Sequence, residues 1–315
     1  MTRLWAFLQN VFAPGLHTAF AAAWFLSLLG TLILLRDPAP VWRFDLPLLL
    51  GVASLLVVLF YLRVVDEVKD YDYDLQHNPD RLLVQGAITH ADLRRWGLGA
   101  ALVVLALNAA LAWLVSPWLL AIVVLDLLWA IGLIRLEAAS AAVRDSMLLN
   151  LGVTYPVNVL MSVYVYVFFL AAYGASPAPQ DAALIAAYLL VFLHYEFARK
   201  TAWPELTGAG ERMYSNVLGG RGALAVVLGC AWGATGLALA LLRPWEHLRG
   251  APLRAGLGFG LLLLPLLTLR MAQRLLANRA ERKKLGGLGM IGLTVFYAGL
   301  GLHALAANRL ALGAP

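Results

Sequence analysis

Residues 66–80 gather carboxylates in a chain that has few of them elsewhere. They read DEVKDYDYDLQHNPD and hold six of the 18 Asp and Glu residues of the protein. If a helix runs through this stretch, Asp66, Asp70 and Asp74 stand at i, i+4 and i+8 on one face, whereas Asp72 points elsewhere. Like charges at this spacing weaken a helix, and a hard divalent cation such as Mg²⁺ would compensate them. The alternative is a solvated charged loop that caps a membrane span.

Residues 194–200, with the sequence HYEFARK, form a second place where charged side chains meet the end of an apolar stretch. A carboxylate near the end of a span is costly unless it is paired. Lys200 stands at i+4 from Glu196, so a structural ion pair is one interpretation. Arg199 and Lys200 also suit the binding of phosphate groups or the anchoring of a span by cytoplasmic positive charge.

The elements that must position these side chains are membrane helices. The chain is 62% hydrophobic and 13% charged, whereas a soluble domain has about 25% charged residues. A helix needs about 20 apolar residues to cross a bilayer. We therefore predict an all-α polytopic membrane protein, with residues 1–315 as a single domain and no disulfide framework, since Cys230 is the only cysteine. Nine stretches qualify as spans: residues 16–36, 46–65, 95–115, 117–136, 146–172, 182–202, 222–242, 253–275 and 287–307.

The distribution of basic residues predicts the orientation of these spans. With the N-terminus and every even-numbered connection on one side of the membrane, that side carries 18 of the 24 Lys and Arg residues. Such a bias marks the cytoplasmic side. We therefore expect a cytoplasmic N-terminus, an external C-terminus, and both charged stretches facing the cytoplasm, in a bacterial cytoplasmic membrane. The net charge of +6 needs no nucleic-acid partner, because anionic lipid headgroups account for it.

The sequence DEVKDYDYD resembles the first aspartate-rich motif of the UbiA superfamily of intramembrane prenyltransferases, which reads Asn-Asp-x-x-Asp-x-x-x-Asp. Asp66 stands in the Asn place and Glu67 in the first Asp place, and both are conservative replacements. Asp70 and Asp74 match the remaining two positions. The continuation HNPDRLLVQGAIT also resembles the family sequence. The resemblance covers nearly the whole chain, because the family fold has nine transmembrane helices.

The second family motif, Asp-x-x-x-Asp at the cytoplasmic end of the sixth helix, is altered here. The local match is Glu196-x-x-x-Lys200, which has a base in the second acidic place. In one interpretation Glu196 still holds a second Mg²⁺, while Arg199 and Lys200 grip the diphosphate. In the other the second metal site is lost, and the reaction is altered or absent. Glu205 and Glu211 are alternative acids further along the chain.

The resemblance implies an activity and a set of site residues. Family members transfer a prenyl chain from a polyprenyl diphosphate to an acceptor, here a lipid-soluble one, with Mg²⁺ as cofactor. The helices of such a bundle surround a central cavity that opens to the cytoplasmic side. The catalytic and metal-binding residues would be Glu67, Asp70, Asp74 and Glu196. The diphosphate would be contacted or supported by Asp66, Asn78, Arg81, Arg199, Lys200 and Tyr214.

Polar residues inside the spans supply further candidates. Asn150, Thr154, Asn158 and Ser162 recur every four residues and form a stripe on one helical face. The stripe makes hydrogen bonds between helices, or it lines the cavity, in which case Asn150 and Asn158 contact substrate. Asp126 lies within the fourth span, where an acid is a functional candidate. It either takes the proton of the acceptor or belongs to a buried ion pair.

Two other functions compete with prenyl transfer. A transporter of cations or small molecules would place its charged groups near the bilayer midplane, at interrupted helices, whereas both charged stretches here lie at one membrane face. A catalytically inactive relative would bind isoprenoid lipid without transferring it, which the altered second motif allows. Metal-dependent release of pyrophosphate separates the enzyme from both.

Overall fold

The computed structural model describes residues 2–36, 41–208, 210–278 and 285–312. Within these ranges nine helical segments are long and apolar enough to cross a membrane, which confirms the predicted all-α membrane fold. Each predicted span overlaps one of these segments. They are Pro14–Arg36, Leu46–Lys69, His90–Leu114, Pro117–Ala139, Met147–Tyr173, Pro179–Arg199, Tyr214–Leu242, Pro252–Ala277 and Gly286–Ala307.

The contacts between residues divide the chain into two compact units. The first holds the described residues of Met1–Phe25, Arg43–Gly174 and Leu312–Pro315, and the second those of Leu26–Trp42 and Ala175–Ala311. The long helix α2 (Pro14–Arg36) contributes to both units. Two short strands, β1 (Val41–Phe44) and β2 (Arg309–Leu312), pair as a two-stranded sheet. A single domain over residues 1–315 stays a prediction.

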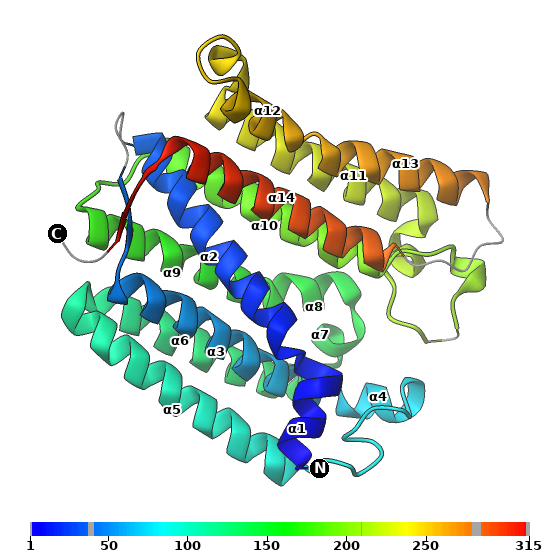
Figure 1. The fold of residues 1–315 in the computed structure, drawn as a ribbon. Coiled ribbons are helices and arrows are strands. Elements are labelled where there is room, and N and C mark those ends of the chain that lie inside the picture. The colour runs from blue at the N-terminus through cyan, green and yellow to red at the C-terminus, as the bar shows by residue number, and fades with distance from the viewer. Residues whose placement is uncertain (1, 37–40, 209, 279–284, 313–315) are drawn as a thin grey trace. The chain divides into compact units, whose positions relative to one another are not determined.

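In the first unit α3 packs against α5 and α6, and α6 packs against α9 (Figure 1). Asn108 of α5 donates to Ser54 of α3 at 2.6 Å and accepts from the hydroxyl of Tyr164 on α9 at 2.8 Å. This buried network fixes three helices against one another. The helices of this unit are α1 (Arg3–Phe7), the π-helical turn η1 (Leu8–Phe12), α3 (Leu46–Lys69), α4 (Tyr71–His77), α5 (His90–Leu114), α6 (Pro117–Ala139), α7 (Ala141–Asp145), α8 (Met147–Thr154) and α9 (Pro156–Tyr173).

Local sequence signals set where these helices begin. Thr89 caps α5 in a reciprocal capping box, in which its hydroxyl accepts from the backbone N–H of Asp92 and the Asp92 carboxylate accepts from the Thr89 backbone. Ser116 caps α6, and Pro117 follows at the first helical position. The connection between α5 and α6 is therefore only two residues long, and the two helices form a tight hairpin.

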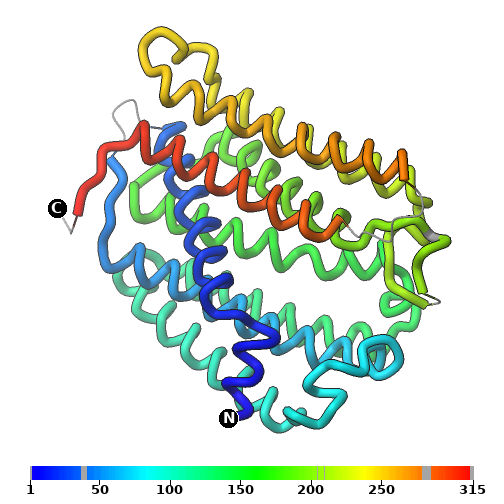
Figure 2. The backbone as a smooth tube through the Cα atoms, turned by 45° about the vertical axis from the view of Figure 1, so that its right-hand side comes forward, coloured from blue at the N-terminus to red at the C-terminus, as the bar shows by residue number. Residues whose placement is uncertain are grey.

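In the second unit α10 packs against both α11 and α14, and α13 packs against α11 and α14 (Figure 2). Tyr188 of α10 donates to the Ser27 hydroxyl of α2 at 2.6 Å, and Asn308 donates to the carbonyl of Gly30 at 3.1 Å. The helices of this unit beyond α2 are α10 (Pro179–Arg199), the 3₁₀ turns η2 (Pro204–Leu206) and η3 (Pro244–His247), α11 (Tyr214–Leu242), α12 (Pro252–Gly260), α13 (Leu263–Ala277) and α14 (Gly286–Ala307).

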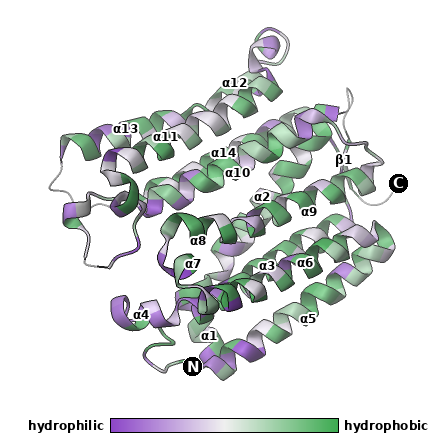
Figure 3. Ribbon diagram, turned by 180° about the vertical axis from the view of Figure 1, so that it is seen from behind, coloured by the Kyte–Doolittle hydropathy of each residue, from purple (hydrophilic) through white to green (hydrophobic). Residues whose placement is uncertain are grey.

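The long helices are mainly hydrophobic, whereas α4 is largely hydrophilic (Figure 3). This short helix directly follows α3 and carries part of the acidic stretch. The stretch therefore lies at the end of a span, as predicted. The seventh span was predicted over residues 222–242, but the corresponding helix α11 already starts at Tyr214. It bends at Gly219, whose φ is +71°.

Candidate active site

The acidic stretch of the first unit is built on the junction of α3 and α4. Asp70 separates the two helices: it is the C-cap residue of α3 and the N-cap residue of α4, with φ −87° and ψ 3°. The Asp70 N–H still donates to the carbonyl of Asp66, and the Asp74 N–H donates to the carbonyl of Asp70, both at 2.9 Å. The i, i+4 hydrogen-bond pattern of a helix is therefore continuous across the junction of α3 and α4.

Two arginines hold the carboxylates that are most buried. Glu67 is 3% exposed and forms ion pairs with Arg63 and, at 3.3 Å, with Arg81. Asp74 is 5% exposed, accepts from the Asn78 amide at 2.6 Å and lies 3.7 Å from Arg81. Arg81 thus bridges Glu67 and Asp74. This bridge brings together four of the residues that the motif predicts as one site.

The charge of the acidic stretch fits a divalent cation. Four carboxylates, of Asp66, Glu67, Asp70 and Asp74, stand against the three cations Arg63, Lys69 and Arg81, so oxygen ligands and negative charge are in surplus. Within the described ranges no three His, Cys, Asp or Glu side chains are gathered closely enough to hold a metal ion by themselves. The fit is therefore to Mg²⁺ held by one or two carboxylates, with the remaining ligands supplied by water and phosphate oxygens.

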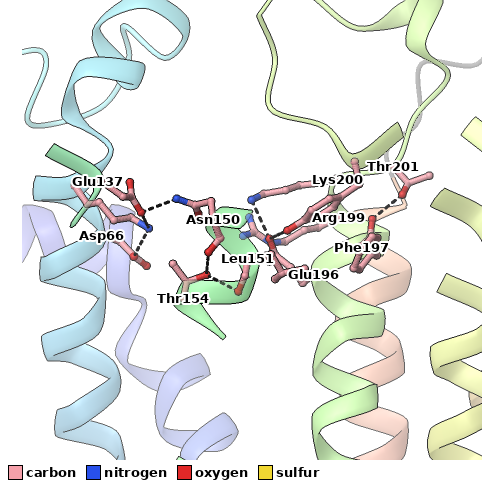
Figure 4. Close-up of polar contacts among 12 residues, drawn as sticks. Asp66, Glu137, Asn150, Leu151, Thr154, Glu196, Phe197, Arg199, Lys200 and Thr201 are labelled. Atoms are coloured by element: carbon pink, nitrogen blue, oxygen red, sulfur yellow. Dashed lines mark hydrogen bonds and ion pairs between the residues drawn. The ribbon is translucent and has the colours of Figure 1, made fainter. Parts of the chain in front are cut away.

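A residue that sequence reasoning missed, Glu137 of α6, completes this cluster. It is 4% exposed, accepts from the Asn150 amide at 2.7 Å and lies 3.4 Å from the ammonium of Lys69 (Figure 4). Glu137 follows the predicted fourth span by one residue, and a carboxylate at the end of an apolar run was the signal that could have identified it.

The polar stripe of the fifth span makes hydrogen bonds within its own helices and to α6. Asn150 makes the interhelical bond to Glu137, which supports the helix-packing interpretation for this residue. The hydroxyl of Thr154 donates to the Asn150 carbonyl at 2.9 Å, and that of Ser162 donates to the Asn158 carbonyl at 3.0 Å. The stripe is divided between α8 and α9, which meet at Tyr155.

Asp126 is buried in α6, at 3% exposure. Among the described residues, no group donates a hydrogen bond to its Oδ1 atom, so the predicted alternative of a buried ion pair finds no support. It lines a small cavity inside the first unit together with Ser54, Met161 and Tyr164. A proton-accepting role stays a prediction.

In the second unit the carboxylate of Glu196 is surrounded by donors. Arg199 Nε donates to Oε2 at 2.6 Å, and Lys200 Nζ lies 2.8 Å from Oε1 (Figure 4). The hydroxyl of Tyr214 donates to Oε1 at 3.2 Å. The side chains of Arg199 and Lys200 remain 42% and 26% exposed, so a ligand can reach both cations.

The chain returns to this carboxylate through the start of α11. The Tyr214 N–H donates to the carbonyl of Lys200 at 3.0 Å, and the Tyr214 ring stacks on Phe197 with centroids 4.2 Å apart. Tyr214 is therefore fixed by backbone and ring before its hydroxyl meets Glu196. The two alternative acids, Glu205 and Glu211, lie in the connection beyond the end of α10.

The residues around Glu196 do not fit a second Mg²⁺. Both carboxylate oxygens already face donors, and among the described residues Arg199 and Lys200 set two positive charges against the one negative charge of Glu196. A divalent cation at this carboxylate would be repelled by both basic side chains. The arrangement suits an anion instead, since Arg and Lys are the usual ligands of phosphate groups.

Solved structures share the arrangement of helices described above. A UbiA homologue from Aeropyrum pernix K1, in its apo form, has a TM-score of 0.63 at 18% identity, over 90% of this chain and 96% of that chain. This chain has the UbiA fold. A digeranylgeranylglyceryl phosphate synthase has a TM-score of 0.59 at 15% identity, over 97% of this chain and 99% of that chain.

A UbiA homologue from Archaeoglobus fulgidus, bound to DMAPP and Mg²⁺, has a TM-score of 0.50 at 14% identity, over 89% of this chain and 96% of that chain. No family model and no curated protein matches the amino-acid sequence. The UbiA fold implied by the sequence DEVKDYDYD is therefore confirmed by structure, at sequence identities of 14–18%.

Proposed function

We propose that this chain is an intramembrane prenyltransferase. It transfers a prenyl chain from a polyprenyl diphosphate to a lipid-soluble acceptor, in a cavity that opens to the cytoplasmic side. The observation that carries the proposal is the carboxylate-rich junction of α3 and α4 at the end of a span in a UbiA fold. Among the proteins with this fold, one is a digeranylgeranylglyceryl phosphate synthase and another binds DMAPP and Mg²⁺.

In this proposal the acidic stretch binds the cofactor. Glu67, Asp70 and Asp74 would supply the one or two carboxylates that bind Mg²⁺, with the support of Asp66, and Arg81 would both orient Glu67 and Asp74 and contact the diphosphate. Bound Mg²⁺ supplies the charge that neutralises the pyrophosphate leaving group. The supporting contacts are the bridge of Arg81 between the two buried carboxylates and the surplus of carboxylates over cations.

The second charged cluster consists of Glu196, Arg199, Lys200 and Tyr214. It binds the diphosphate of the substrate through its two basic side chains. Arg199 and Lys200 neutralise diphosphate oxygens, while Glu196 holds the two cations in place and itself accepts a hydrogen bond from Tyr214. The bond between the first prenyl carbon and its oxygen breaks, and pyrophosphate leaves with the bonding electrons. The acceptor nucleophile then forms its bond to that carbon and loses a proton. Exclusion of water by the apolar helices protects the allylic cation.

The altered second cluster also favours one alternative, a protein that binds isoprenoid diphosphate without transferring it. Lys200 occupies the second acidic place of the family pattern, so loss of a second metal could leave binding intact and chemistry slow. A transporter is the remaining alternative, with ion flux into liposomes as its signature.

The proposal is tested by pyrophosphate release from purified protein given geranylgeranyl diphosphate, lipid-soluble aromatic acceptors and Mg²⁺. We expect release that stops with EDTA and falls about 100-fold or more in the Asp70→Ala/Asp74→Ala variant, because leaving-group stabilisation worth several kcal/mol is lost. The matched control is Asp72→Ala/Asp80→Ala, which removes two exposed acids from the same stretch and should keep the rate. Mg²⁺-dependent binding of the diphosphate without release of pyrophosphate would favour the inactive binder. If the protein neither binds the diphosphate nor releases pyrophosphate, the proposal is refuted.

A further inference from the structure

Lys69 is a buried cation in the middle of the acidic stretch. Its side chain is 10% exposed, and its ammonium lies 3.8 Å from Asp66 Oδ1 and 3.4 Å from Glu137 Oε1. The carboxylate of Asp70 is also within electrostatic reach. One ammonium is thus shared between the proposed metal-binding stretch and a carboxylate outside it.

Glu137 is held in place so that it can face this ammonium. Its side chain is 5% exposed, and a buried carboxylate persists only when it is paired and hydrogen-bonded. The pairing comes from Lys69 of α3, and the hydrogen bond comes from Asn150 of α8 at 2.7 Å. Three helices of the first unit therefore meet at one carboxylate, which none of the sequence motifs includes.

We propose that Glu137 is a positioning residue that draws Lys69 away from the carboxylates of the acidic stretch. This inference rests on the proposed metal binding by that stretch. An ammonium and a divalent cation compete for the same oxygens, and a Lys side chain is flexible enough to follow its strongest partner. Glu137 provides that partner, so Asp66 and Asp70 stay available for the metal ion.

The proposal makes the effect of removing Glu137 depend on Lys69. In Glu137→Gln, Lys69 loses one of its anionic partners and pairs more fully with Asp66 and Asp70, which weakens metal binding. In Glu137→Gln/Lys69→Met the competing ammonium is gone and the affinity returns. If Glu137 were itself a metal ligand, or acted only on stability, the second substitution would restore nothing.

The test is a titration of purified protein with Mn²⁺ alone, followed by the electron paramagnetic resonance signal of free Mn²⁺. We expect Glu137→Gln to raise the Mn²⁺ dissociation constant about tenfold, and Glu137→Gln/Lys69→Met to return it to within about twofold of the wild type. The matched control, Asp92→Asn, removes another carboxylate of the same unit that pairs with a base, Arg3, and should leave Mn²⁺ binding unchanged.

Any other outcome contradicts the inference about Glu137. The outcomes differ in whether they also contradict the proposed function. Unchanged affinity in Glu137→Gln, or a loss that Lys69→Met does not reverse, removes the positioning role and leaves the proposed function standing. If the wild-type protein binds no Mn²⁺, metal binding by the acidic stretch fails, and the proposed function loses its cofactor together with this inference.

Discussion

Two glutamates of this chain show how neighbours decide the role of a residue. Glu67 shares its surroundings with Asp66, Asp70 and Asp74, so negative charge prevails around it even with Arg63 and Arg81 attached. Among the described residues, Glu196 pairs with both Arg199 and Lys200, so the positive charge of its two basic partners exceeds its own negative charge. In the proposed function, the same side chain therefore belongs to a cation site in one unit and to an anion site in the other.

Lys200→Asp should convert the second cluster from an anion site into a metal site. Removing the cation restores an acid at i+4 from Glu196, so we expect about one additional Mn²⁺ per chain when inorganic pyrophosphate is present. Pyrophosphate binding in EDTA should weaken about tenfold, because a charge-assisted contact is lost and an anion is gained. Equilibrium dialysis measures both quantities.

Lys200→Arg is the control for this exchange, since it keeps the charge and the reach to phosphate. It should leave both the Mn²⁺ count and the binding of pyrophosphate close to wild type. An unchanged Mn²⁺ count in Lys200→Asp would contradict the predicted conversion. A count that falls in Glu196→Gln would mean that Glu196 already ligates a metal ion in the natural sequence.

At the scale of elements, the start of α11 decides whether the second cluster forms. Gly219 adopts a φ of +71°, a left-handed conformation that other residues rarely adopt, and it bends the helix after its first turn. Gly220 follows, and a Cβ atom built there would lie 2.6 Å from the ring of Trp203. The Trp203 indole is fixed in turn by a hydrogen bond to the carbonyl of Leu275 at 2.9 Å. The connection after α10 is thus packed directly onto α11.

Gly220→Ala should destabilise the protein by about 1–3 kcal/mol, because the added methyl group overlaps a ring that is held in place. Thermal unfolding in detergent would report a lower midpoint, and pyrophosphate binding should weaken because Tyr214 lies in the first turn of the same helix. Gly229→Ala is the matched control in the same helix, since a Cβ atom there meets nothing within 4 Å. Equal unfolding midpoints for the two variants would show that the Trp203 ring can move to accommodate the added methyl group without a cost in stability.

At the scale of the whole molecule, the charge bias of the sequence predicts an orientation that labelling can test. Cys230 is the only cysteine and is 7% exposed, so a Cys230→Ala background accepts single reporter cysteines. Asp72 and Glu246 are both exposed and lie at the connections after the second and the seventh spans. The positive-inside rule places them on opposite sides of the membrane.

In intact cells, a membrane-impermeant maleimide should label Glu246→Cys and should label Asp72→Cys only after permeabilisation. The reverse pattern would place the acidic stretch outside and would separate it from a cytoplasmic supply of diphosphate substrate. Equal labelling of both reporters in sealed cells would contradict the predicted topology as a whole. Unreplaced Cys230 in an otherwise natural chain serves as the unlabelled control.

Much of the fold could be predicted from the sequence because membrane spans depend on local properties. Apolar length, the Pro and Ser residues at helix starts and the bias of basic residues are all carried by neighbouring residues. The same holds for the acidic stretch, whose position at the end of a span could be read from one chain segment. The fifth span was predicted in one piece, and its division at Tyr155 was not visible in hydropathy alone.

The sequence by itself predicted a membrane protein with nine spans and with an acidic and a basic stretch at span ends. Only the tertiary structure decided the partners of those charges. Lys69 meets Glu137 across 68 positions of the chain, and Tyr214 returns to Glu196 after 18. Such pairings depend on how each helix is rotated and packed against the next, which spacing within one helix does not encode. For this reason the carboxylates close to Lys69 in the sequence were predictable, whereas the buried carboxylate of Glu137, which faces Lys69 from another helix, was not.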